Sequence, residues 1–253
     1  MNNKFDFNDS HVDLLPTKVK FGFTLAEVLI TLGIIGIVAA MTIPTLISRK
    51  QKLEIETQLK ETYSIIQQGL KMAENDDLAL NSEVTEYTIN DWFDTYFAPY
   101  IKYSRVCYDS AGCWQNFGPT KNLSGNTTYI SRTGIGIGAN IVTIKLTNGS
   151  NLILDSYGVK DLKQYMGLNV SHESLVIIID ANGDKRPNII GKDIFFAVLT
   201  DKGLVPVGVD ESNDTINKNC SATATGVNAG YYCLLKVKNN GWTIPDDVWN
   251  KKI

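Results

Sequence analysis

A predominantly apolar run of 25 residues, Phe23 to Ile47, is the feature that most restricts what this chain can fold into. As a helix rising 1.5 Å per residue, the run would span roughly 37 Å, which exceeds the ~30 Å hydrocarbon core of a bilayer. Basic residues, Arg49 and Lys50, follow it directly. The run therefore predicts a membrane span. It also contains one charge, Glu27, and ionisable residues within such spans are costly and usually functional.

Three interpretations compete for this segment. A secretory signal peptide would need a shorter apolar stretch and a small-residue cleavage site, which residues 38–40 could supply, but the apolar run continues to Ile47. A plain signal anchor explains the length and leaves Glu27 unexplained. Cleavage between Gly22 and Phe23 would instead place a new amino group one helical turn from Glu27, at the helix end that favours an anion. In a bundle of such helices, Glu27 of one subunit could meet the amino terminus of its neighbour.

The stretch "KFGFTLAEVLITLGIIGIVAAMTIP" resembles the N-terminus of type IV pilins and type II secretion pseudopilins. Carried over onto this sequence, the resemblance makes Gly22 the residue before the cut, Phe23 the N-methylated first residue and Glu27 the assembly glutamate. Pro44 falls where many members carry a helix-kinking proline. The likeness covers about 30 residues and does not distinguish a pilus from a secretion pseudopilus. The 22-residue leader is longer and more acidic than many in the family.

The chain is expected to divide into a leader (1–22), a transmembrane and assembly helix (23–47) and an extracytoplasmic globular domain (48–253). Beyond the span, apolar residues recur at spacings of three and four, which predicts an amphipathic helix. They are Ile55, Leu59, Tyr63, Ile66, Leu70 and Ala73. One helix is therefore expected from about Thr24 to Glu74.

In the second half of the sequence, the apolar residues no longer recur at the spacing of a helix, and their pattern predicts strands. "IVTIKLTNGSNLILDS" is typical of a hairpin that turns at Asn148-Gly149. Residues 174–180 and 193–200 are expected to be further strands, and 204–209 an edge strand. A short helix is expected over 88–100 and a polar loop over 104–126. The order predicts an α+β fold of the pilin-like kind, with the long helix against an antiparallel sheet.

The four cysteines fall into two pairs that are close in sequence, Cys107 with Cys113 and Cys220 with Cys233. Local pairing is the simplest of three connectivities, although the sequence alone does not choose among them and free thiols remain open. Disulfides would place the domain outside the cytoplasm. The spacings and the two histidines do not favour a zinc site.

The remaining motifs give weak indications of chemistry. Asp180, Asn182 and Asp184 alternate as at the start of a calcium loop, but the later ligand positions do not fit, and a bare turn is favoured over calcium. Residues 134–139, "GIGIGA", match a dinucleotide fingerprint without its strand–helix context. His172 lacks any metalloprotease spacing. No enzyme, metal or cofactor is expected.

The net charge of −3 shows no excess of basic residues of the kind that binds nucleic acid. The chain is interpreted as a prepilin-like subunit of the bacterial inner membrane, with its C-terminal domain on the extracytoplasmic side. It would then enter a type IV pilus or a periplasmic pseudopilus. The partners implied by the resemblance are other pilin subunits, a prepilin peptidase and methylase, the inner-membrane assembly machinery and membrane lipid. The alternative is a membrane-anchored binding module that never polymerises.

Overall fold

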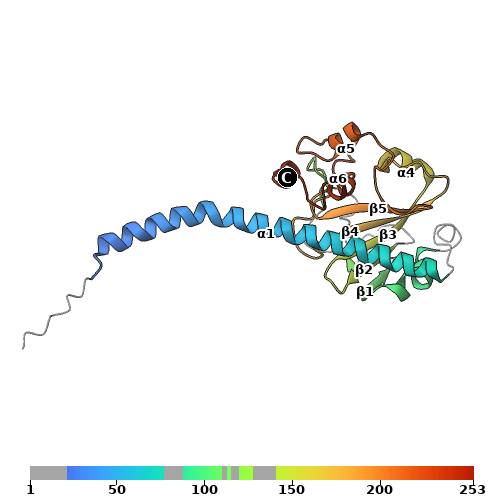
Figure 1. Cartoon of the computed structure of the whole chain (residues 1–253), viewed down its shortest axis with the longest axis horizontal. Helices are drawn as coiled ribbons and strands as arrows, with labels where there is room; N and C mark the ends of the chain where they lie inside the picture. Colours follow the sequence, from blue (N-terminus) through green and yellow to red (C-terminus); the bar gives the residue numbers. More distant parts are fainter. Residues whose placement is uncertain (1–21, 77–87, 110–112, 115–119, 128–140) are drawn as a thin grey trace, which may run out of the picture. The chain divides into compact units, whose positions relative to one another are not determined.

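A computed structural model describes residues 22–76, 88–109, 113–114, 120–127 and 141–253 of the chain (Figure 1). The chain separates into two compact units at Ile47/Ser48. The helices are α1 (Leu25–Asn75), α3 (Ile89–Trp92), the π-helix η1 (Phe93–Phe97), the 3-10 turn η2 (Ala98–Tyr100), α4 (Val159–Met166), α5 (Asn213–Asn219), α6 (Cys233–Asn239) and α7 (Asp246–Trp249). The strands are β1 (Tyr103–Tyr108), β2 (Val142–Leu146), β3 (Asn151–Tyr157), β4 (Ser174–Asp180), β5 (Ile194–Thr200) and β6 (Gly203–Pro206).

The six strands form one antiparallel sheet in sequence order, β1 to β6. The predicted hairpin is β2–β3, and Gly149 at its turn has the positive φ that such a turn requires (φ 93°). Pro206 lies in β6 at the sheet edge, where its missing N–H leaves no ladder bond unmade. The α+β prediction, a long N-terminal helix with an antiparallel sheet, is confirmed.

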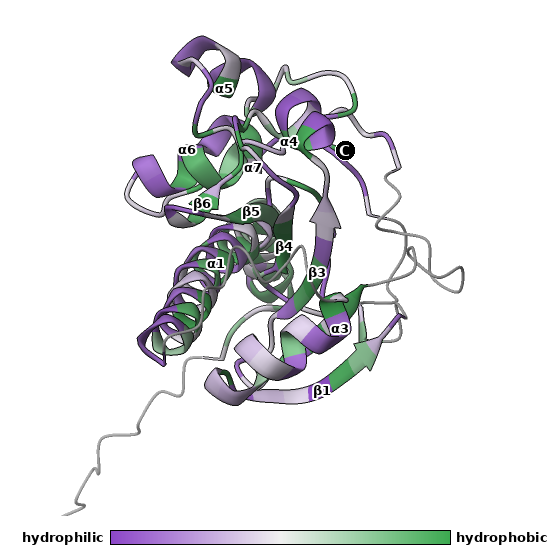
Figure 2. Ribbon diagram, turned by 90° about the vertical axis from the view of Figure 1, so that its right-hand side faces the viewer, coloured by the Kyte–Doolittle hydropathy of each residue, from purple (hydrophilic) through white to green (hydrophobic). Residues whose placement is uncertain are grey.

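The neighbouring strands β4 and β5 consist mostly of apolar residues (Figure 2) and are buried along almost their whole length. One face, with Ile177 and Phe195, joins the same core as the apolar stripe of α1. The other face, with Ile178 and Phe196, packs with residues of α4 and α6. Because both faces are covered, β4 reads as a continuous apolar run instead of an alternating one.

The predicted stripe on the long helix is the face that the globular unit buries. All six stripe residues are at most 3% exposed: Ile55, Leu59, Tyr63, Ile66, Leu70 and Ala73. Gly69 lies on the same face, and a Cβ there would come within 2.8 Å of the Ile101 side chain, so the glycine permits close packing.

Two sequence expectations need correction. Residues 104–126 are not all loop, because β1 pairs with β2 from Tyr103 to Tyr108. The C-terminal region also contains α5, α6 and α7, which no periodicity signalled, because helices of four to seven residues are too short to show a repeating apolar face.

Candidate processing and assembly site

The expected cleavage junction lies just before the long helix. Gly22 and Phe23 are exposed and non-helical, and the Phe23 side chain is 88% exposed. The helix begins at Leu25, and the first turn is closed by the Val28 amide, which donates to the Thr24 carbonyl at 3.2 Å. The Gly22–Phe23 peptide bond therefore lies in exposed, non-helical backbone, where a protease could reach it.

Glu27 has a partner within its own chain. The amide and the hydroxyl of Thr24 both donate to Oε2 of Glu27, at 2.8 and 2.9 Å, and the Glu27 amide donates to the Thr24 hydroxyl at 3.2 Å. This is a capping box, in which the first and fourth residues of a Thr-x-x-Glu sequence satisfy the free amides of a helix start. Thr24 was not among the residues expected from the sequence to form this site, although "TLAE" ahead of an apolar run is the sequence signature of a capping box.

The capping box explains why a carboxylate is compatible with this helix start. An anion at the first turn is also favoured by the partial positive charge of the helix N-terminus. Both bonds from Thr24 end on Oε2, and Oε1 takes no part in the box. The Oε1 oxygen of Glu27 is therefore not used by the capping box.

The first unit presents its apolar side chains on every side of the helix. Leu29, Ile35 and Leu46 are each about three-fifths exposed, and none of the apolar window is buried. By length and composition, α1 could cross a membrane. The helix continues through Pro44. Exposed apolar surface of this extent needs lipid or another protein to cover it.

All four cysteines are in disulfide bonds, Cys107–Cys113 and Cys220–Cys233. Cys220 ends α5 and Cys233 begins α6, so the second bond ties these two helices together. Gly191 packs against this bond, and a Cβ at Gly191 would lie 2.8 Å from the Cys233 sulfur. The bond is therefore part of the core next to β5 and not a surface staple.

The three residues of the calcium-like motif do not lie in one site. Asp184 is exposed, forms a salt bridge with Lys145 and accepts a hydrogen bond from Asn151 at 3.0 Å. Partial desolvation raises the pKa of Asp184, but the hydrogen bonds from Lys145 and Asn151 and the charge of Lys145 together outweigh it, so the pKa is lowered. Asp180 is instead fully buried. The glycine motif 134–139 lies outside the described residues.

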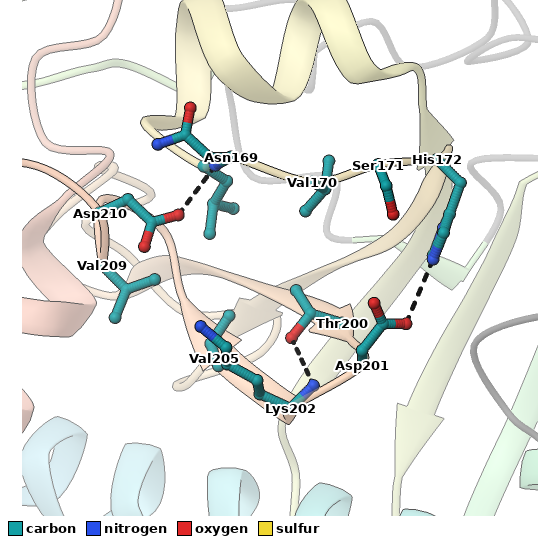
Figure 3. A pocket seen from close by; sticks show the side chains of 11 residues that line it. Asn169, Val170, Ser171, His172, Thr200, Asp201, Lys202, Val205, Val209 and Asp210 are labelled. Carbon is teal, nitrogen blue, oxygen red and sulfur yellow. Dashed lines mark hydrogen bonds and ion pairs between the residues drawn. The ribbon is translucent and has the colours of Figure 1, made fainter.

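His172 lines a surface pocket of about 250 Å³ with the turn after β5 (Figure 3). One ring nitrogen lies 2.9 Å from the Glu173 carbonyl and the other 3.2 Å from an Asp201 carboxylate oxygen. The bond to the Glu173 carbonyl, followed by Asp201, raises the pKa of His172. Across the part of the chain that the structure describes, no group of three or more His, Cys, Asp or Glu residues could hold a metal ion.

Two family models match parts of the chain. Residues 45–114 match a family of unknown function (DUF6613), and residues 17–43 match the prokaryotic N-terminal methylation motif. No curated protein and no solved structure matches the chain. The methylation motif spans the Gly22–Phe23 junction, the Thr24–Glu27 box and the exposed apolar helix described above. Residues 17–43 therefore carry the prepilin-type cleavage and methylation signal of type IV pilins.

Proposed function

We propose that this chain is the precursor of a structural filament subunit, cut between Gly22 and Phe23 and assembled into a type IV pilus or a type II secretion pseudopilus. The observation that carries the proposal is the helix 25–47, whose apolar side chains are exposed all round while its only charge lies in its first turn. A lipid bilayer covers such a helix before assembly, and like helices cover it in a filament core.

Glu27 has two functions in this proposal. Within one chain it caps the helix through Oε2. Between chains its charge attracts the amino group that cleavage creates on Phe23 of a neighbouring subunit. The capping box survives cleavage, because the Thr24 amide remains a peptide N–H when Phe23 becomes the first residue. Charges within the bilayer usually pair with one another, and this pairing would set the axial stagger of the subunits.

The globular unit would form the outer surface of the filament. Its two disulfides favour an oxidising compartment on the extracytoplasmic side of the bacterial inner membrane. The partners would be other pilin or pseudopilin subunits, the prepilin peptidase and methylase, and the assembly machinery. The role is structural and not enzymatic.

The experiment separates the two functions of Glu27 with two variants. Glu27→Gln keeps a capping side chain and removes the charge, whereas Thr24→Val removes the capping hydroxyl and keeps the charge. Both variants should be cleaved and inserted in the membrane. Incorporation into sheared filaments, relative to total membrane protein, should fall at least tenfold for Glu27→Gln and remain within about twofold of wild type for Thr24→Val.

Equal incorporation of wild type and Glu27→Gln would show that Glu27 only caps the helix. If the processed wild-type chain also stays in the membrane fraction when the assembly machinery is active, the anchored, non-polymerising binding module becomes the better interpretation.

A further inference from the structure

Three segments that are far apart in the sequence meet at the start of the globular unit, just beyond the apolar run of α1. The indole of Trp249, at the end of α7, donates to the Ser48 hydroxyl at 2.9 Å. The Gln51 side chain donates at 2.7 Å to the carbonyl of Arg186, in the loop between β4 and β5. These contacts define one surface of the globular unit, the basal face, which consists of residues 48–52, 184–186 and 246–252.

The basal face is basic, although the chain as a whole is slightly acidic. It has seven lysine or arginine residues and three aspartates, whereas the chain has 24 basic and 27 acidic residues. Two of the four arginines in the sequence, Arg49 and Arg186, belong to it. An excess of one sign of charge on one surface attracts a partner of the opposite charge.

Only part of this positive charge is neutralised within the chain. Lys52 pairs with Asp246 and Glu56. Lys50 forms a pair with Glu54 at 3.6 Å, but both side chains are exposed, and such pairs contribute little. Four further exposed cations form no salt bridge with any described residue: Arg49, Lys185, Arg186 and Lys252.

With the apolar run anchored in a bilayer, as proposed above, the basal face lies at the membrane surface. Ser48 follows Ile47 directly in the same helix. A helix rises only 1.5 Å per residue, so residues 49–52 lie within about 8 Å of the end of the apolar run. Trp249, which bonds to Ser48, is half-buried, and tryptophan is enriched at the boundary between hydrocarbon and water.

We propose that the basal face binds the phosphate groups of anionic phospholipids in the bilayer that anchors α1. Arginine binds phosphate through two parallel N–H donors, and lysine adds a compact positive charge. Each cation close to an anionic membrane surface strengthens binding about fivefold. The inference rests on the membrane anchor of the proposed function and not on filament assembly.

The anchor is the reason for choosing a lipid over a soluble acidic partner. A tethered surface meets its ligand at a high effective concentration, and the headgroups next to the anchor are such a ligand. The apolar helix itself holds any lipid through the acyl chains, so selection among lipids falls to the basal face. Because its cations come from α1 and from two segments bonded to α1, binding would orient the globular unit on the bilayer.

The test titrates the full chain, in nonionic detergent, with phosphatidylglycerol or phosphatidylcholine and counts bound lipids by native mass spectrometry. The two lipids carry the same acyl chains, so the apolar helix does not distinguish them. Wild type should bind phosphatidylglycerol at least tenfold more tightly. The double variant Lys185→Gln/Arg186→Gln should reduce this preference at least fivefold, because it removes two exposed cations while the backbone carbonyl that accepts from Gln51 remains.

The matched control is Lys160→Gln/Lys163→Gln, which removes the same charge from exposed positions of α4, outside the basal face. It should keep the wild-type preference. Raising sodium chloride from about 50 to about 500 mM should weaken the preference of wild type, because salt screens exposed charges. This last measurement needs no variant and decides the matter if the double variant does not fold.

Equal binding of the two lipids by wild type at low salt would overturn the inference. So would an equal loss of preference in the basal-face variant and in the control. Displacement of phosphatidylglycerol by an equal concentration of glycerol phosphate would overturn the assignment to lipid and indicate a site for free phosphate. Failure of the full chain to enter phosphatidylcholine vesicles would instead contradict the membrane anchor, and with it the proposed function.

Discussion

The hydroxyl of Tyr63 on the long helix donates to the carbonyl of Leu204 in the edge strand β6, at 2.9 Å, in a fully buried position. The Lys238 ammonium donates to the same hydroxyl at 3.3 Å and lies 4.9 Å from the centre of the Tyr63 ring. One side chain thus links α1, β6 and α6. This contact anchors the helix to the far edge of the sheet as well as to its centre.

Tyr63→Phe should destabilise the globular unit by about 1–2 kcal/mol, because the ring remains packed while the buried Leu204 carbonyl loses its donor. Chemical denaturation of the two proteins would measure this difference. Tyr165→Phe, at an exposed site, is the control and should change stability by less than about 0.5 kcal/mol. Equal effects of both substitutions would mean that the Tyr63 hydroxyl contributes nothing specific.

The two disulfides should contribute unequally to stability. Replacing Cys220 and Cys233 by alanine should cost about 3 kcal/mol from the 13-residue separation alone, against about 2 kcal/mol for Cys107 and Cys113, separated by six. The difference should be larger in practice, because both Cys220 and Cys233 are completely buried. Denaturant midpoints of the two double variants decide the order. A greater loss for the Cys107 and Cys113 variant would contradict it.

Asp155 should make the stability of the globular unit depend on pH. Burial raises its pKa from 3.8 to about 6, with bonds to Ser156 and Tyr157 in opposition. A carboxyl whose pKa is higher in the folded state binds more protons when folded. Its contribution is therefore fully present below about pH 4 and is lost as the pH rises to about 6.

Asp155→Asn should remove this part of the pH dependence, which is on the order of 2 kcal/mol. The measurement is the wild-type minus variant difference in unfolding free energy at pH 4 and at pH 7. Wild type should lose stability relative to the variant between these values. A difference that does not change with pH would show that the Asp155 carboxyl is not protonated at pH 4 to 6 in the folded state.

The mature chain should begin at Phe23 and carry a methyl group on its amino nitrogen. Intact mass of protein from membranes with an active prepilin peptidase would show the loss of residues 1–22 and the added methyl. The uncut precursor should accumulate when the peptidase is inactivated. A mature N-terminus at Met41 would sink the prediction and identify the segment as an ordinary signal peptide.

The sequence by itself determined the features that depend on neighbours along the chain. Three such features have a local physical cause. The apolar run from Phe23 to Ile47 is long enough to cross a bilayer, and the stripe from Ile55 to Ala73 follows the period of a helix. The Asn148-Gly149 turn provides the positive φ that a tight hairpin needs. The Thr24–Glu27 box is also local and could have been read from the sequence.

Only the tertiary structure decided which distant groups meet. Sequence spacing grouped Asp184 with Asp180, but strand pairing brings Lys145 to Asp184 and places Asp193 beside Asp180. The physical reason is that β4 and β5 are antiparallel, so the residues at the two ends of their connecting loop become neighbours while the middle of the loop points elsewhere. A period of two or 3.6 residues describes one element at a time and contains no information about such pairings.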